Sequence, residues 1–352
     1  MLQINKQNNF GFLRLFFAIL VIFSHSPESI DGNRSREPMA RIFGNMSMGD
    51  LAVNCFFMIS GFLILMSYQH SSSFNVYLKK RILRIYPGFI LAYLFCLFCI
   101  VPLAKDIQML LNFDYWFWIK SVFRMLTLQA PWISGVFHTP YSYINGPMWT
   151  IKYEFLCYLI LPMISYFFKN NLKLYVYLFL FSLSLFFLFG LFNISLTTPK
   201  PFDFESGVFL RLFSAYLIGN IFYLAREKIV FDTKYTILSI LILLGLLFNK
   251  QFAHIALITC GAYLLFNFAL NYKSKFLNKI GTKTDLSYGI YLYAWPIQNL
   301  IIQNNPTINP LTLSLMVLSI AAVLALISWT LVEKPFMNMK NSLSQTALSR
   351  TS

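Results

Sequence analysis

The sequence predicts an all-α polytopic membrane protein, and three observations support this fold class. Of the 352 residues, 57% are apolar and only 12% are charged. The apolar residues gather in runs of about 18 or more, which is the length that a helix needs to cross a bilayer. Lys and Arg residues collect in alternate segments between these runs, as they do in chains that cross a membrane repeatedly.

We expect about ten transmembrane helices, one for each apolar run between charged or Pro, Asn and Gly breaks. The first run is kept as a span and not read as a signal peptide, because it contains Arg14 and no small-residue cleavage pattern follows it. The expected spans are residues 10–26, 50–68, 86–104, 147–168, 172–192, 208–225, 234–248, 253–270, 286–304 and 311–332.

An aromatic segment at 112–130, NFDYWFWIKSVFRMLTLQA, is not counted among the spans. It contains Asp114, Lys120 and Arg124, so we expect an interfacial helix or a re-entrant piece within a long outer loop at 105–146. Residues 1–340 are expected to form a single transmembrane domain, and residues 341–352 a short polar cytoplasmic tail. The five cysteines fall within apolar runs and predict neither a disulfide framework nor a metal site.

Charge predicts the orientation of the spans. Of the 28 Lys and Arg residues, 17 lie on the side of the two termini and eight on the other side, which predicts that both termini are cytoplasmic. The net charge of +15 therefore belongs mostly to the cytoplasmic face. It suits anionic lipid headgroups or an anionic ligand from the cytoplasm and not nucleic acid, although positive-inside topology alone also accounts for it.

Arg14 and His25 are ionisable residues within or at the edge of the first run. They stand eleven positions apart, about three helical turns, so they share one face and lie roughly 16 Å apart along the axis. A guanidinium binds phosphate oxygens in pairs, and a neutral imidazole can take a proton from a hydroxyl group. This face therefore suits a long donor with its phosphates inside and its reactive end outside. The alternative is a snorkelling arginine and an interfacial histidine.

Glu154 lies deeper in its span. Pro147 suits the first turn of that helix, which places Glu154 about 10 Å below the outer edge, too deep for a short side chain to reach water. It must be paired, protonated or in contact with an aqueous cavity. Glu154 could orient the imidazole of His25 if the first and fourth helices are neighbours. Lys152 lies on a different face of the same helix.

Several strings, taken in order, resemble the signatures of the acyltransferase type 3 family of multi-span membrane O-acyltransferases, from about residue 10 to about residue 336. They are LRLFFAILVIFSH with its Arg-x10-His spacing, FFMISGFLI, LKKRILRIYP, GPMWTIKYEFLCYLILP, LSYGIYLYAWP and LVEKPF. The chain has Tyr293-Ala294-Trp295-Pro296 where many members have Trp-His-x-Pro. The late histidine of those members is therefore missing here. This argues against a mechanism with a second histidine and makes His25 the main candidate for the catalytic histidine.

The resemblance implies transfer of an acetyl or other short acyl group from cytoplasmic acetyl-CoA, the acyl donor and co-substrate, without a metal. The acceptor would be a carbohydrate or glycolipid hydroxyl, on a surface polysaccharide or a lipid-linked sugar such as O-antigen, lipopolysaccharide or capsule, at a bacterial inner membrane. It implies His25 and Glu154 as catalytic residues and Arg14, Arg81 and Arg84 as donor contacts.

Three further residues are candidates for substrate binding, namely Trp149, Lys152 and Arg211. Arg211 could instead pair with Asp203 or Glu205. Ser60 and Gly61 of FFMISGFLI are better explained by close helix packing than by a functional bend.

Two other functions remain open from sequence alone. Intramembrane charges could line the path of a transporter or flippase for a glycolipid or anionic metabolite. Such a protein would be expected to show inverted repeats and paired Gly- or Pro-broken helices, which the sequence does not display. An inactive structural partner is the second alternative, and the Arg14, His25 and Glu154 set argues against it. The sequence does not predict an oligomeric state.

Overall fold

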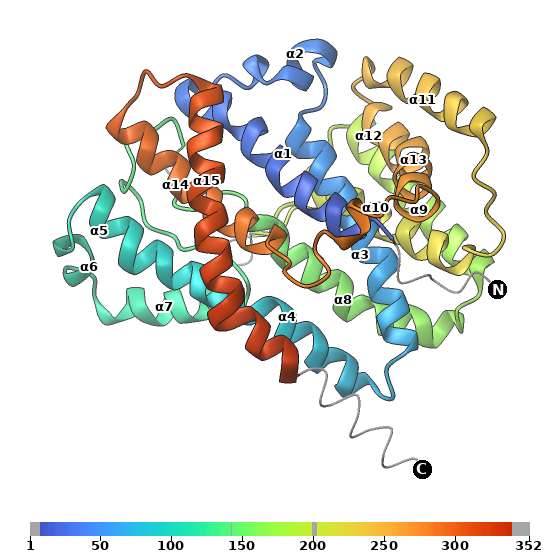
Figure 1. Cartoon of the computed structure of the whole chain (residues 1–352), viewed down its shortest axis with the longest axis horizontal. Coiled ribbons are helices and arrows are strands. Elements are labelled where there is room, and N and C mark those ends of the chain that lie inside the picture. Colours follow the sequence, from blue (N-terminus) through green and yellow to red (C-terminus); the bar gives the residue numbers. More distant parts are fainter. Residues whose placement is uncertain (1–7, 142, 199–202, 340–352) are drawn as a thin grey trace. The chain divides into compact units, whose positions relative to one another are not determined.

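The computed structural model describes residues 8–141, 143–198 and 203–339, which are predominantly helical (Figure 1). The only β-type pairing among these residues is an isolated antiparallel bridge between Thr197 and Glu205. The predicted all-α class is therefore confirmed. The expected polar tail at 341–352 lies outside the described residues.

Long helical segments occupy each of the ten apolar runs. They are α1 (Phe10–Asp31), α3 (Met48–Gln69), α4 (Phe74–Phe95) continued by η2 (Cys96–Ile100) and α5 (Val101–Ala104), α8 (Trp149–Phe168), α9 (Leu172–Leu191), α10 (Ser206–Leu224), α11 (Thr233–Leu247), α12 (Ala253–Ala256) continued by η3 (Leu257–Gly261), α13 (Ala262–Phe266) and η4 (Asn267–Asn271), α14 (Ser287–Asn304), and α15 (Pro310–Ser328) continued by η6 (Trp329–Glu333). Shorter elements are η1 (Arg34–Arg36), α2 (Pro38–Phe43), α6 (Gln108–Leu111), α7 (Tyr115–Leu126) and η5 (Leu277–Lys279).

Among the described residues, eight helices are long and apolar enough to cross a membrane. Helix α11, with 15 residues, falls short in length. Helix α14 is not among the eight and carries Gln298, Asn299 and Gln303 along its length. The chain is thus a multi-pass membrane protein, whereas the count of ten spans and the orientation stay predictions. The aromatic segment contains the 12-residue helix α7, and its placement at a membrane surface also stays a prediction.

Two helix boundaries differ from the prediction in ways that affect the candidate residues. The third helix begins at Phe74 and not near residue 86, because the Ser73 hydroxyl accepts a hydrogen bond from the backbone N–H of Val76 and caps the helix. Arg81 and Arg84 are therefore helical residues and not loop residues. Helix α1 continues five residues beyond the predicted end at 26, through Pro27 to Asp31, so His25 is followed by further helix.

The chain forms two compact units, and α1 contributes to both. Unit 1 comprises Met1–Phe17, Met39–His70 and Tyr153–Lys283, and unit 2 comprises Ala18–Pro38, Ser71–Lys152 and Thr284–Ser352. In unit 1, the main packing partners are α3 with α10 and α9 with α10. In unit 2, α14 lies beside α15 (Figure 1), and α4 packs on η6.

Glycine permits the close crossing of α3 and α10 within unit 1. A Cβ atom on Gly61 would lie 1.9 Å from the backbone oxygen of Tyr216, and one on Gly219 would lie 2.1 Å from that of Met58. Two helix backbones can approach this closely only where both carry glycine. The prediction that Gly61 serves helix packing is confirmed. The crossing also fixes the position of Ser60, the preceding residue on α3.

Candidate active site

His25 lies in the last two turns of α1, within unit 2. Its buried Nδ1 atom lies 3.7 Å from the Oε2 atom of Glu28, three residues further along the same helix. Helical residues at this spacing share a face. The His25 side chain keeps 28% of its surface exposed, and the buried Nδ1 atom contributes almost nothing to that exposed part. An imidazole held in this way can accept a proton through its other nitrogen.

Two aromatic residues enclose this pair. The Tyr141 hydroxyl donates a hydrogen bond of 2.6 Å to Oε1 of Glu28. The buried Trp295 ring stands perpendicular to the imidazole with 5.0 Å between ring centroids, and its Nε1 donates to the backbone oxygen of Tyr143. Burial has the largest effect on the pKa of Tyr141, and the hydrogen bond to Glu28 the next largest. Together they raise this pKa to about 12, so the phenol keeps its proton at neutral pH. We call His25, Glu28, Tyr141 and Trp295 the His25 cluster.

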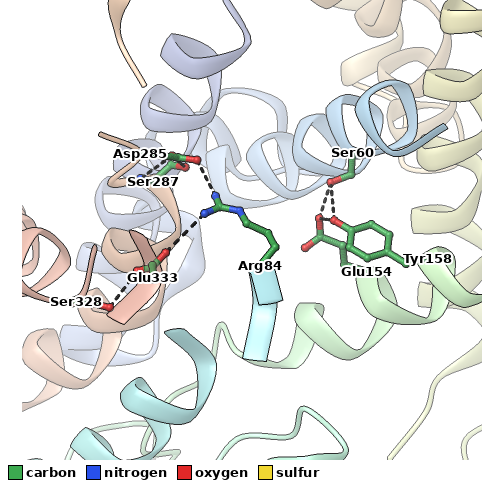
Figure 2. Close-up of polar contacts among 8 residues, drawn as sticks. All are labelled: Ser60, Arg84, Glu154, Tyr158, Asp285, Ser287, Ser328 and Glu333. Carbon is green, nitrogen blue, oxygen red and sulfur yellow. Dashed lines mark hydrogen bonds and ion pairs between the residues drawn. The ribbon is translucent and has the colours of Figure 1, made fainter. Parts of the chain in front are cut away.

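Arg84 is the centre of a second cluster in unit 2, the Arg84 cluster (Figure 2). Its Nη2 atom lies 2.6 Å from Oδ2 of Asp285, and its Nη1 atom lies 3.6 Å from Oε2 of Glu333. The hydroxyl groups of Ser287 and Ser328 donate to Asp285 at 2.6 Å and to Glu333 at 3.0 Å, respectively. One guanidinium thus faces two carboxylates, each of which accepts a further hydrogen bond.

The surroundings of the Arg84 cluster are closely packed. The guanidinium carbon lies 5.7 Å from the ring centroid of Tyr288 and 6.0 Å from that of Trp329. A Cβ atom on Gly88 would lie 2.9 Å from the Tyr288 ring and 3.2 Å from the Glu333 carboxyl carbon. A phosphate group that bound Arg84 would have to compete with two carboxylates already in place.

Glu154 lies in the part of α8 that belongs to unit 1, where it accepts two hydrogen bonds on one oxygen (Figure 2). The donors are the Ser60 hydroxyl, from α3, and the Tyr158 hydroxyl, one turn further along α8 at 2.5 Å. The expectation that Glu154 must be paired, protonated or hydrated is met by pairing. Within its own unit Glu154 therefore joins α8 to α3, whereas the carboxylate beside His25 in unit 2 is Glu28.

Arg211 is buried in α10 of unit 1. Its Nη1 atom lies 3.5 Å from Oδ1 of Asp50 and 3.5 Å from Nδ1 of His254. Asp50 also closes the capping box at the start of α3 with Ser47. The expected candidates for pairing with Arg211 were Asp203 and Glu205, but the nearby acidic group that the structure identifies is Asp50, which is distant in sequence.

The remaining candidate residues lie on three helices, α1, α4 and α8. Arg14 is half-buried in the part of α1 that belongs to unit 1. Arg81 is buried near the start of α4, with its guanidinium carbon 5.8 Å from the ring centroid of Tyr77. Trp149, which is 37% exposed, and the half-buried Lys152 lie in the first turn of α8, within unit 2.

The sequence reasoning missed several residues that complete these clusters. Glu28 lies beyond the predicted end of the first span at residue 26, and the prediction therefore did not include it. Its i,i+3 spacing from His25 would place both side chains on one face of a longer helix. Tyr158 stands four residues after Glu154 and could have been found in the same way. Asp285 joins Arg84 across about 200 residues of sequence, and no local pattern indicates that pairing.

Comparison with known proteins finds one acyltransferase family and relatives that match the chain over nearly its full length. The model of a family described as an acyltransferase domain matches residues 8–333. An O-acetyl transferase of Shigella phage Sf6 is 29% identical over 344 residues, which cover 95% of this chain and 97% of the phage protein. Nodulation protein 10 of Rhizobium leguminosarum bv. viciae is 26% identical over 365 aligned positions, which cover 97% of this chain and 96% of that protein.

A partial match links the chain to acyltransferase MdmB of Streptomyces mycarofaciens, which is 27% identical over 117 residues, or 33% of this chain and 28% of that protein. No solved structure matches the chain.

Proposed function

The chain belongs to the acyltransferase type 3 family, and on that basis we propose that it transfers an acetyl group from acetyl-CoA to a carbohydrate hydroxyl. The full-length similarity to a phage O-acetyl transferase supports acetyl as the transferred group. The proposed acceptor is a surface polysaccharide or lipid-linked sugar such as O-antigen, lipopolysaccharide or capsule. The proposed location is a bacterial inner membrane, crossed by about ten helices with both termini in the cytoplasm.

The observation that carries this proposal is the environment of His25. Its imidazole has one buried nitrogen beside a carboxylate, and the side chain as a whole is partly exposed, which suits a general base. The other ring nitrogen, Nε2, would take the proton of the acceptor hydroxyl while the hydroxyl oxygen attacks the thioester carbonyl carbon. The carbon–sulfur bond then breaks, and the imidazolium returns the proton to the departing CoA sulfur. The products are an acetyl ester and CoA with a free thiol.

Arg81 and Arg14 are the residues that we propose for contacts with the donor's phosphates. Both are guanidinium groups near the predicted cytoplasmic ends of their helices, and a guanidinium binds phosphate oxygens in pairs. Arg84 was expected to share this role. Because two carboxylates already neutralise it, we propose that Arg84 supports donor binding indirectly, by holding α4 against η6. Glu154 would then hold α3 and α8 together within unit 1.

Acceptor contacts are proposed for Trp149, Lys152 and Arg211. Trp149 exposes part of an aromatic ring, which could stack on a sugar face. Lys152 could donate hydrogen bonds to sugar oxygens.

Label transfer in membranes of the native host tests the proposed function. Membranes that contain the wild-type protein, His25→Ala or His70→Ala at matched protein levels would be incubated with acetyl-labelled acetyl-CoA. Lipid-linked and polysaccharide fractions would then be extracted. His70 is an exposed histidine at the end of α3 and serves as the matched control.

We expect base-labile label in a sugar fraction with the wild-type protein and with His70→Ala, and none with His25→Ala. Absence of CoA-dependent label with the wild-type protein would overturn acetyl transfer from CoA. Undiminished label with His25→Ala would overturn the role of His25 as the base.

A further inference from the structure

We propose that Glu28 is the positioning carboxylate of His25 and that Tyr141 holds Glu28 in place. The inference rests on the proposed function, since it names the residues that make His25 an effective base. It is carried by three contacts of the His25 cluster, all within unit 2. These are Glu28 Oε2 to His25 Nδ1 at 3.7 Å, Tyr141 hydroxyl to Glu28 Oε1 at 2.6 Å, and the perpendicular packing of Trp295 on the imidazole.

The first step concerns the tautomer of His25. A general base must carry its proton on the nitrogen that faces away from the substrate, so that the other nitrogen is free to accept. A carboxylate beside Nδ1 favours a proton on that atom and stabilises the imidazolium once the acceptor hydroxyl has lost its proton. Among the residues that the structure describes, the buried Nδ1 atom has no hydrogen-bond partner within 3.5 Å, and Glu28 is the carboxylate beside it. A contraction of less than 1 Å from 3.7 Å would form it, and catalytic hydrogen bonds often tighten only when substrate binds.

The second step concerns the orientation of Glu28. A glutamate side chain at the end of a helix has several rotamers, and only some of them point an oxygen towards His25. The Tyr141 hydroxyl ties one carboxylate oxygen down, which leaves the other directed at the imidazole. Because the pKa of Tyr141 is raised to about 12, this donor is retained through the working pH range. The loop that carries Tyr141 therefore controls the catalytic histidine through Glu28.

The third step concerns the aromatic neighbour of the imidazole. Trp295 is buried, and its Nε1 donates a hydrogen bond to the backbone oxygen of Tyr143. The indole ring that packs against the imidazole is therefore held in place. The backbone of Gly146 also lies close to the Trp295 ring, because a Cβ atom on Gly146 would lie 3.1 Å from that ring. Glu28 and Trp295 are the two neighbours that hold the orientation of the imidazole in this proposal. Arg34 and Asp31 also act on this cluster, since Arg34 lowers the pKa of Tyr141 and Asp31 raises it.

The test uses the full-length protein in membranes, acetyl-labelled acetyl-CoA and the sugar fraction of the native host as acceptor. The variants are Glu28→Gln, Glu28→Asp and Tyr141→Phe. Glu227→Gln, at an exposed carboxylate, is the matched control. The maximal rate, the apparent KM for acetyl-CoA and the pH dependence of the rate are measured at matched levels of folded protein, checked by size-exclusion chromatography.

We expect Glu28→Gln to lower the maximal rate about 100-fold with little change in the KM for acetyl-CoA, because general base catalysis typically contributes a factor of this size. Glu28→Asp keeps the charge and should retain more activity than Glu28→Gln. Tyr141→Phe should cost less, about tenfold, because the carboxylate remains. The carboxylate stabilises the imidazolium, so the pH at which activity rises should move to lower values in Glu28→Gln.

A purely structural role for Glu28 predicts the reverse order. Gln preserves the length of the side chain and its contact with Tyr141, so Glu28→Gln would then be milder than Glu28→Asp and would leave the pH profile unchanged. That result, or a rate for Glu28→Gln within about twofold of the wild type, overturns the inference. If the wild-type protein transfers label and His25→Ala does not, such a result leaves the proposed function standing. If the wild-type protein transfers none, the proposed function itself fails.

Discussion

Replacing Arg84 with alanine should destabilise the protein strongly, because it removes the guanidinium that pairs with both Asp285 and Glu333. Glu333 is 2% exposed and Asp285 is 9% exposed, so water cannot take over the role of the guanidinium. Removing one partner from a buried ion pair costs about 3–5 kcal/mol, since the remaining charge stays buried and uncompensated. Arg84 itself is 17% exposed, which favours the lower end of this range, about 3 kcal/mol.

Denaturant unfolding in detergent micelles, followed by tryptophan fluorescence, measures this cost. The matched control is Arg36→Ala, because Arg36 pairs with Asp31 where both side chains are well exposed and water screens the charges. Its unfolding free energy should stay close to that of the wild type. The triple variant Arg84→Ala/Asp285→Asn/Glu333→Gln should regain most of the loss, because it buries no unpaired charge. Equal stability of Arg84→Ala and Arg36→Ala would refute the argument, as would a triple variant less stable than Arg84→Ala.

Three further predictions concern unit 1 and the donor contacts. Gly61→Ala should lower the unfolding free energy by about 1–3 kcal/mol, because the new Cβ would lie 1.9 Å from the backbone oxygen of Tyr216. The control is Gly190→Ala, where no described atom lies within 4 Å of the new Cβ. Equal losses in the two variants would contradict the packing argument. Ser60→Ala removes one of two donors to Glu154 and should destabilise by about 1–3 kcal/mol in the same assay, whereas a change below about 0.5 kcal/mol would show that the contact contributes little. Arg81→Ala should raise the KM for acetyl-CoA roughly tenfold or more while leaving unfolding less affected than Arg84→Ala, and an unchanged KM would remove Arg81 from the donor site.

Sequence alone predicted the helical elements well, because a bilayer imposes a strong and local constraint on the chain. Each apolar run is helical in the structure, and the errors lie at the ends of helices. The starts at Phe74 and the end at Asp31 were missed because caps and polar helical turns extend a helix beyond its apolar part. The family resemblance was also readable from ordered motifs, and the match over residues 8–333 confirms it.

The candidate residues were less completely predictable. The reasoning that Glu154 could not stand alone inside a span was correct, because the cost of an unpaired charge does not depend on the fold. Its partners, Ser60 and Tyr158, required the packing of α3 on α8 to be known. The role of Arg84 changed for the same reason. The motif identified a basic residue on the expected cytoplasmic face, but only the structure brought two acidic groups to it.

The sequence by itself therefore determined the class of the protein, the positions of its long apolar helices, its family and the types of residue that hydrocarbon should exclude. These follow from interactions within about one helical turn or from the solvent that surrounds the chain. The tertiary structure decided which of those residues meet. His25 is accompanied by Glu28, Arg84 by Asp285 and Glu333, and Arg211 by Asp50, and all but the first of these pairings join residues far apart in the chain. Such pairings depend on which helices pack together and at what rotation, which is a property of the whole core and not of any single segment.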